Sequence, residues 1–294
     1  MEKIKTIVDV ISPGNLIQKE IEIPFNDGDI EVKVIQNGIC KSDIRLFQDK
    51  DPFLGDEFSG HEGIGVVLRS KHKFFKVGDI VATFWHPCYT DHSVWKGDKC
   101  ISINSISESE IGSEFVVQPV ACVINAIIQQ SPIAGKKVLV LGSGYFAFVI
   151  DILTKEYPIF DVVDFYGHYN VNRFDNHTSV LKIDYYDLVI DVSGKYVKCW
   201  VECLKENGEY LIVANNDALI SIDTWHASWK NVRFTFPSPR NPKFIGSMVD
   251  ASNLILQNRE KFRELHTVVE RKDLLSFLQN PRQAIKGVVR YASL

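Results

Sequence analysis

The chain has 294 residues, enough for two domains, and its 45% hydrophobic and 24% charged residues are typical of globular proteins. The formal net charge is -4 and no long charged run occurs, which argues against nucleic acid or an anionic membrane as partner. The amino-terminal residues do not resemble a secretion signal, and no apolar run approaches the roughly 20 residues that cross a bilayer. Six scattered cysteines form no disulfide framework, so we expect reduced thiols and a cytoplasmic protein.

The first part of the chain is predicted to be rich in β-strands. Apolar and polar residues alternate with a period of two, which is typical of half-buried antiparallel strands. Pro13-Gly14 and Asn26-Asp27-Gly28 supply turns between them. The predicted strands cover 5–11, 17–23, 29–35, 63–68 and 79–84.

The second part alternates between strand and helix patterns, which predicts a parallel doubly wound sheet. Strands are predicted at 137–141, 162–166, 187–192 and 209–214, and helices at about 116–126, 145–157 and 195–206. The last part returns to the first domain, with helices predicted at 250–258 and 271–278 and a strand at 285–291. The predicted domains are therefore 1–118 with 241–294, and 119–240.

Two short segments of the first domain carry the residue types of a metal site. Gly38-Ile-Cys-Lys-Ser-Asp43 offers the Cys40 thiolate, and Gly60-His-Glu-Gly63 offers the His61 imidazole and the Glu62 carboxylate. A catalytic zinc has three such protein ligands and one open position. A lone cysteine or histidine is more often an ordinary core residue, so the pair of segments carries the prediction.

A glycine-rich turn follows the strand 137–141. In Gly142-Ser-Gly-Tyr-Phe-Ala147, Gly142 permits the tight turn, Gly144 lets a pyrophosphate approach the backbone, and Ala147 allows close helix–strand packing. Tyr145 and Phe146 complete the turn and open the helix, whose amino terminus favours phosphate groups. The segment predicts a dinucleotide site.

These motifs, with Val77-Gly-Asp-Ile-Val81 between them, resemble in their order the zinc-dependent medium-chain dehydrogenases/reductases, which include alcohol, sorbitol and threonine dehydrogenases. The resemblance implies a GroES-like β-barrel catalytic domain and a Rossmann domain with a doubly wound parallel sheet. It also implies an NAD(P)-dependent alcohol or polyol dehydrogenase with one catalytic zinc, assembled as a homodimer or homotetramer.

The resemblance also suggests which residues bind zinc. Gln118 occupies the position where relatives carry a third acidic or thiolate ligand, and its amide is a poor zinc ligand. Glu62 would replace it, as in sorbitol-dehydrogenase-like relatives, so the predicted ligands are Cys40, His61, Glu62 and water, with Gln118 kept as a candidate. Only Cys88 and Cys100 stand where larger relatives have four cysteines, so we predict no structural zinc.

Four neighbouring residues have roles implied by the resemblance. Asp43 would accept a hydrogen bond from His61 and fix its tautomer. Ser42 would pass the alcohol proton outward, and Lys41 matches a position near the cofactor pyrophosphate. Arg45 stands where many relatives carry a relay histidine, so the proton would leave by another route.

Trp85 and His86 fall where relatives line the substrate pocket. Ordinary packing is an equally open interpretation of both residues. A polyol, sugar or sugar phosphate is the expected small-molecule substrate.

The identity of the nicotinamide cofactor depends on where the second strand ends. Asp164 lies at the distance at which NAD enzymes place an acid on the ribose. A strand that ends at Gly167 instead puts His168 and Arg173 near its tip, which suits a 2′-phosphate, although both residues could belong to a solvated loop. The stretch around 157–168 also resembles the NADPH-dependent ribulose-5-phosphate reductases, so NADP is favoured and NAD stays open.

Two other functions remain possible from the sequence. One is a zinc-free NADPH reductase of the same family, since Gln118 weakens the metal site. The other is a non-catalytic nucleotide-binding scaffold. A cysteine-protease role for Cys40 and His61 is rejected, because no oxyanion arrangement is visible.

Overall fold

The computed structural model describes residues 2–49, 59–103, 105–129, 133–167, 171–194, 200–214, 221–238, 241–281 and 284–291. The chain forms two compact units, one made of Met1–Ala121 with Met248–Leu294 and the other of Cys122–Ser247. The boundaries between the two units lie within the helices Val117–Ile128 and Phe244–Gln257. Each boundary follows the one expected from the sequence by several residues.

The first unit is built on a seven-stranded sheet whose central strand is β3 (Asp29–Gly38). This strand pairs with β4 along one edge and with β6 and β14 along the other, so nearly all of its residues are buried. A separate hairpin of β1 and β2 packs on the unit, and β1 alternates between buried and exposed side chains as its sequence predicts. The strands of this part are β1 Lys3–Ser12, β2 Asn15–Pro24, β4 Gly63–Ser70, β5 Ile80–Thr83, β6 His92–Lys96 and β7 Cys100–Ser102.

The end of the chain completes this sheet. Strand β14 (Lys286–Arg290) pairs antiparallel with β3 and parallel with β13 (His266–Glu270). The backbone N–H of Ile39 donates to Gly287 O at 2.9 Å, which fixes the start of β14 beside the Cys40 segment. The helices that belong to or enter this unit are α1 Lys41–Phe47, α2 Val117–Ile128, α5 Phe244–Gln257, α6 Arg259–Leu265 and α7 Leu274–Gln279. No helix in the described part of the chain is long and apolar enough to cross a membrane.

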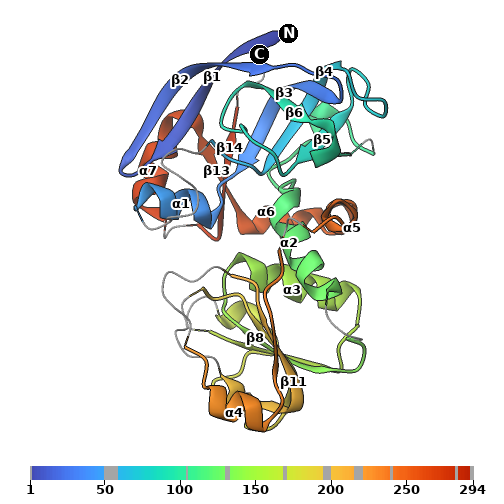
Figure 1. Ribbon diagram of the computed structural model, residues 1–294, viewed down its shortest axis with the longest axis vertical. Helices are drawn as coiled ribbons and strands as arrows, with labels where there is room; N and C mark the ends of the chain where they lie inside the picture. Colours follow the sequence, from blue (N-terminus) through green and yellow to red (C-terminus); the bar gives the residue numbers. More distant parts are fainter. Residues whose placement is uncertain are drawn as a thin grey trace. The chain divides into compact units, whose positions relative to one another are not determined.

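The second unit holds a five-stranded parallel sheet in the order β12-β11-β10-β8-β9. Figure 1 labels two of its strands, β8 and β11. Its strands are β8 Lys137–Leu141, β9 Val162–Tyr166, β10 Tyr186–Asp191, β11 Leu204–Ile212 and β12 Arg233–Thr235. Strands β8 and β10 lie inside the sheet and are almost entirely buried, as expected of parallel strands. The strand order reverses between β8 and β10, where α/β sheets bind ligands at the carboxyl ends of their strands. The predicted fold class is confirmed.

Helix α3 (Tyr145–Glu156) follows β8 directly. Gly144 is its N-cap, and the helix ends before Pro158, which disfavours helical backbone in the preceding residue. Ala147, Ile150 and Val149 are buried, which packs the helix onto the unit. A shorter helix, α4 (Thr224–Trp229), precedes β12.

The helix predicted at 195–206 was wrong wherever the structure describes this segment. Val201–Cys203 is a short 3₁₀ turn, and β11 starts at Leu204. Val201, Cys203 and Leu204 are all buried in the core of the second unit, with Tyr186 and Tyr210 in the same cluster. Asn207 lies in β11 with φ of 62°, so it forms a turn within the strand rather than a helix end. Residues 195–199 lie outside the described part.

Candidate functional site

Cys40 is the N-cap of α1, directly after the central strand β3. Its backbone N–H donates to Asp43 Oδ2 at 2.9 Å, so the carboxylate closes the first turn of the helix. The hydroxyl of Tyr89 donates to the same oxygen at 2.6 Å, and both side chains are completely buried. Asp43 and Tyr89 therefore fix the position of the Cys40 backbone.

The predicted hydrogen bond from His61 to Asp43 stays a prediction. Asp43 Oδ2 accepts from Tyr89 and from Cys40 N–H, and Asp43 Oδ1 is buried without a hydrogen-bond partner among the described residues. Burial raises the pKa of Asp43, although the charge of His61 and the Tyr89 hydrogen bond act in the opposite direction. Asp43 acts on His61 through its charge.

Glu62 lies in the turn that leads into β4. Its backbone N–H donates to Asn37 Oδ1 at 2.9 Å, and Gly38 N–H donates to Glu62 O at 3.1 Å, which ties this turn to the end of β3. The Glu62 side chain is completely buried, and a Cβ on Gly38 would overlap its carboxylate. Glycine at position 38 therefore makes room for Glu62.

Cys40, His61 and Glu62 come together as the sequence predicts. One ligand atom of each lies within 4.8 Å of the others, at spacings that a single ion could span. Oε1 of Glu62 is buried and has no hydrogen-bond partner among the described residues, which is costly unless a cation or donor approaches it. The soft thiolate, the imidazole and the carboxylate together fit zinc.

His61 has an unusual charge balance. Burial would lower its pKa, but a hydrogen bond with Cys40 and the negative charges of Cys40, Asp43 and Glu62 raise it to about 9. Three anionic groups around one imidazole thus attract positive charge. A proton supplies that charge in the absence of a metal, and a metal ion would replace it.

Lys286 also belongs to this site, and sequence reasoning missed it. Its Nζ lies 2.6 Å from Glu62 Oε2, and its side chain is only 7% exposed. Burial opposes the charged form, but the carboxylate of Glu62 and the charge of Cys40 outweigh it and raise the pKa of Lys286. A lysine at the start of a strand has no motif to mark it, and only the pairing of β14 with β3 reveals its position.

The other predicted residues of the first unit lie on nearby elements. Lys41 and Ser42 begin α1, where Lys41 is exposed and Ser42 half-buried, and Gln118 is buried in the first turn of α2. Arg45 is buried on α1. A metal-binding role for Gln118 stays a prediction.

Trp85 and His86 lie between β5 and β6. Their rings stack with centroids 5.3 Å apart, and His86 is exposed while Trp85 is half-buried. Partial burial of its ring and the positive charge of His61 lower the pKa of His86. His86 is therefore close enough to the metal-ligand cluster for the charge of His61 to affect it, and its role in a substrate pocket stays a prediction.

In the second unit, the carboxyl ends of three strands meet around the glycine-rich turn. Gly142 has φ of 122°, and a Cβ there would lie 3.0 Å from the backbone of Ser193 after β10. A Cβ on Gly167, after β9, would lie 2.7 Å from Ser143 Oγ. Glycine at position 142 is thus required by both its backbone conformation and its close neighbour.

The turn leaves space where a phosphate would bind. A Cβ on Gly144 would meet no atom within 4 Å, and no side chain caps the amino end of α3. Ala147 is completely buried against the unit, as predicted, and Tyr145 is buried while Phe146 is half-buried. The amino terminus of this 12-residue helix suits a pyrophosphate.

Contacts within the protein already engage the carboxylate of Asp164. It lies in the middle of β9, and its Oδ2 accepts hydrogen bonds from Tyr186 at 2.7 Å and Lys182 at 2.8 Å. The strand ends at Tyr166, so Gly167 stands at its tip. Arg173 is exposed with its guanidinium 5.9 Å from the ring centroid of Phe148 on α3, and His168 lies outside the described residues.

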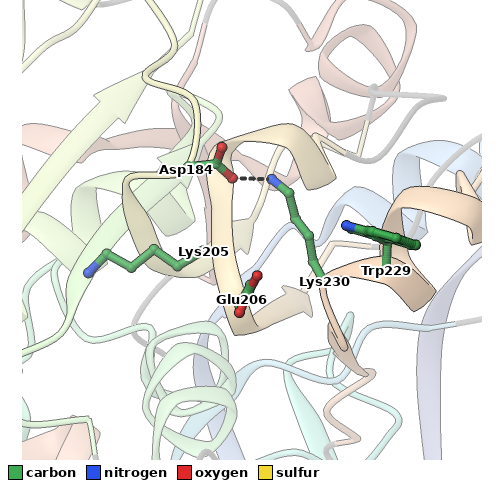
Figure 2. Close-up of a pocket in the computed structure, with 5 residues that line it drawn as sticks. All are labelled: Asp184, Lys205, Glu206, Trp229 and Lys230. Carbon is green, nitrogen blue, oxygen red and sulfur yellow. Dashed lines mark ion pairs between the residues drawn. The ribbon is translucent and has the colours of Figure 1, made fainter.

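A pocket of about 390 Å³ lies at the amino-terminal edge of the same sheet, lined by Asp184, Lys205, Glu206, Trp229 and Lys230 (Figure 2). Lys230 pairs with Asp184 at 2.6 Å and also donates to the carbonyl oxygens of residues 201, 202 and 204. The ammonium group of Lys230 is thus occupied by contacts within the protein. The dinucleotide segment lies at the opposite, carboxyl-terminal edge, so this pocket is not the predicted cofactor site.

One segment of the chain matches a known domain family. Residues 26–125 match the alcohol dehydrogenase GroES-like domain. The comparison with curated protein sequences gave no significant match.

Several solved structures share the fold over nearly their whole length. TarJ from S. aureus in complex with NADPH is 15% identical, with a TM-score of 0.81 over 99% of this chain and 100% of that one. L-idonate 5-dehydrogenase from Escherichia coli is 16% identical, with a TM-score of 0.78 over 99% of each chain. Acetophenone reductase from Geotrichum candidum in complex with NAD is 16% identical, with a TM-score of 0.78 over 99% of this chain and 98% of that one. At these identities the likeness concerns the fold.

Proposed function

We propose that the chain is a medium-chain dehydrogenase/reductase and that it acts as a zinc-dependent oxidoreductase; the matching GroES-like domain and the shared fold support this. It would transfer hydride between NADP, or alternatively NAD, and an alcohol or carbonyl group of a polyol, sugar or sugar phosphate. The observation that carries the proposal is the cluster of half-buried Cys40 and His61 with buried Glu62. Its unpartnered Glu62 oxygen and its three anionic neighbours around His61 favour a divalent cation.

Each residue has a proposed task. Cys40, His61 and Glu62 would hold the zinc, which when bound supplies a Lewis acid for the substrate oxygen. Ser42 would accept the alcohol proton, and Asp43 with Tyr89 would keep the Cys40 segment in place. In the second unit, the turn at Gly142–Gly144 would bind the pyrophosphate, and the cofactor itself carries the hydride.

Arg173 supports the lean towards NADP. With Asp164 engaged by Tyr186 and Lys182, no acid of β9 is left for the ribose hydroxyls, whereas Arg173 offers an exposed guanidinium for a 2′-phosphate. Replacing Arg173 by glutamine should weaken NADPH binding by about tenfold while leaving NADH binding unchanged, since one charge-assisted contact is lost. Fluorescence titration of both cofactors measures this, and equal effects on the two would assign Arg173 to the solvated loop.

Elemental analysis of freshly purified protein tests the metal site. We expect about one zinc per chain in the wild type and its loss in Cys40→Ser and Glu62→Gln, because each removes one of three ligands. Cys122→Ser, which changes a thiol outside the cluster, is the matched control and should retain zinc. Gln118→Ala tests the remaining ligand candidate.

The alternatives predict different results. Wild-type protein that takes up no zinc but oxidises NADPH with a carbonyl substrate would be a zinc-free reductase. Tight NADPH binding without zinc and without turnover on any polyol, sugar or sugar phosphate would favour the scaffold. Assembly as a homodimer or homotetramer and a cytoplasmic location stay predictions.

A further inference from the structure

Lys286 holds the carboxylate of Glu62 from the side opposite its free oxygen. The two side chains form an ion pair of 2.6 Å on Glu62 Oε2, with exposures of 7% and 0%. Glu62 Oε1 has no hydrogen-bond partner among the described residues. The carboxylate thus has one oxygen neutralised by Lys286 and one oxygen left for another cation.

The backbone gives Lys286 little freedom. Ile39 N–H donates to Gly287 O at 2.9 Å, and Val288 pairs with Gly38, so Lys286 enters the site at the level of Cys40. Because both the lysine and the glutamate are buried, neither charge can be compensated by water. Each therefore depends on the other as long as no metal ion is present.

Counting charges shows how a metal would fit. When all three are ionised, the Cys40 thiolate and the carboxylates of Asp43 and Glu62 would carry three negative charges; Asp43 and Glu62 are buried and Cys40 is half-buried. Lys286 supplies one positive charge and a divalent ion two, which together balance these three charges. The two cations would repel each other across the one Glu62 carboxylate.

We propose that Lys286 tunes the metal site through its charge: it pairs with Glu62 Oε2 and stabilises the carboxylate while the metal is absent. The inference rests on the proposed zinc site and deepens it. Lys286 thereby competes with the metal for Glu62 and keeps the metal affinity lower than three ligands alone would give.

The test combines zinc titration against a chelator with thermal unfolding of metal-free and zinc-loaded protein. Metal-free Lys286→Met should unfold roughly 6–20 °C below the wild type, because the buried Glu62 charge loses its partner. Zinc should bind this variant about tenfold tighter or more, because a positive charge beside the metal has been removed. Added zinc should therefore raise its melting temperature by more than it raises that of the wild type.

Two further variants separate the effect of the Lys286 charge from simple packing. Lys286→Arg keeps the charge and should retain wild-type zinc affinity. Lys286→Met combined with Glu62→Gln removes both charges and should recover metal-free stability, while zinc binding falls below the wild-type level. Zinc binding to Lys286→Met that is unchanged or weaker would overturn the proposal even if the protein folds. A wild type that binds no zinc would instead refute the proposed function, and this role of Lys286 with it.

Discussion

Replacing Tyr89 by phenylalanine tests whether Asp43 is held as a charged group in the core of the first unit. The Tyr89 hydroxyl donates to Asp43 Oδ2 at 2.6 Å, and both side chains are completely buried. Phenylalanine has the same shape without the hydroxyl, so no cavity arises. A hydrogen bond to a charged group contributes about 1.5–3 kcal/mol, and we expect the free energy of unfolding to fall by about 2 kcal/mol. For a unit of this size that is roughly 4–8 °C in melting temperature.

Tyr291→Phe is the matched control in the same hydrophobic cluster. Tyr291 is 6% exposed, and its hydroxyl is buried without a hydrogen-bond partner among the described residues. Removing an unsatisfied hydroxyl should be neutral or stabilising. Urea unfolding of the metal-free proteins, followed by tryptophan fluorescence, compares the two variants. Equal losses of stability in both would refute the reasoning, as would a loss below about 0.5 kcal/mol in Tyr89→Phe, which would mean a neutral Asp43.

Three further predictions concern the cofactor and the metal. Gly144→Ala should fold normally and lose NADPH affinity about tenfold or more, because its methyl group enters open space beside the phosphate site. Gly142→Ala should in addition lower the free energy of unfolding by about 1–3 kcal/mol. Isothermal titration measures the affinity of each variant, and thermal unfolding measures its stability. Asp164→Asn should lower the free energy of unfolding by about 1–3 kcal/mol, because contacts such as the hydrogen bond from Tyr186 become weaker. The ratio of NADPH to NADH affinity should stay unchanged. A changed ratio would mean that Asp164 contacts the cofactor. Because the pKa of His61 is raised to about 9 from 6.5, its stabilisation of the metal-free protein should be complete below pH 6.5 and disappear as the pH rises through 9. Zinc must displace that proton, so its apparent affinity should increase across the same pH range, and a flat profile from pH 6.5 to 9 would contradict the pKa.

The sequence was sufficient to predict elements whose formation depends on residues close together in the chain. Strands β8 and β9 begin and end where the sequence predicts, at 137–141 and 162–166. For β8 the reason is that a parallel strand inside the sheet is buried on both faces and has a nearly continuous apolar pattern. The helix predicted at 195–206 failed for the opposite reason. Cys203 and Leu204 are apolar because they fill the core next to Tyr186, a distant neighbour that no local periodicity records.

The metal-site candidates were also accessible from the sequence, since Cys40, His61 and Glu62 stand in short segments with recognisable spacing. Their partners were not. Tyr89 reaches Asp43 and Lys286 reaches Glu62 only because strands distant in the chain pair beside β3. A sequence therefore determines which ligand types are available, whereas the tertiary structure decides which charges are buried together, because the energy of a buried charge depends on every group around it.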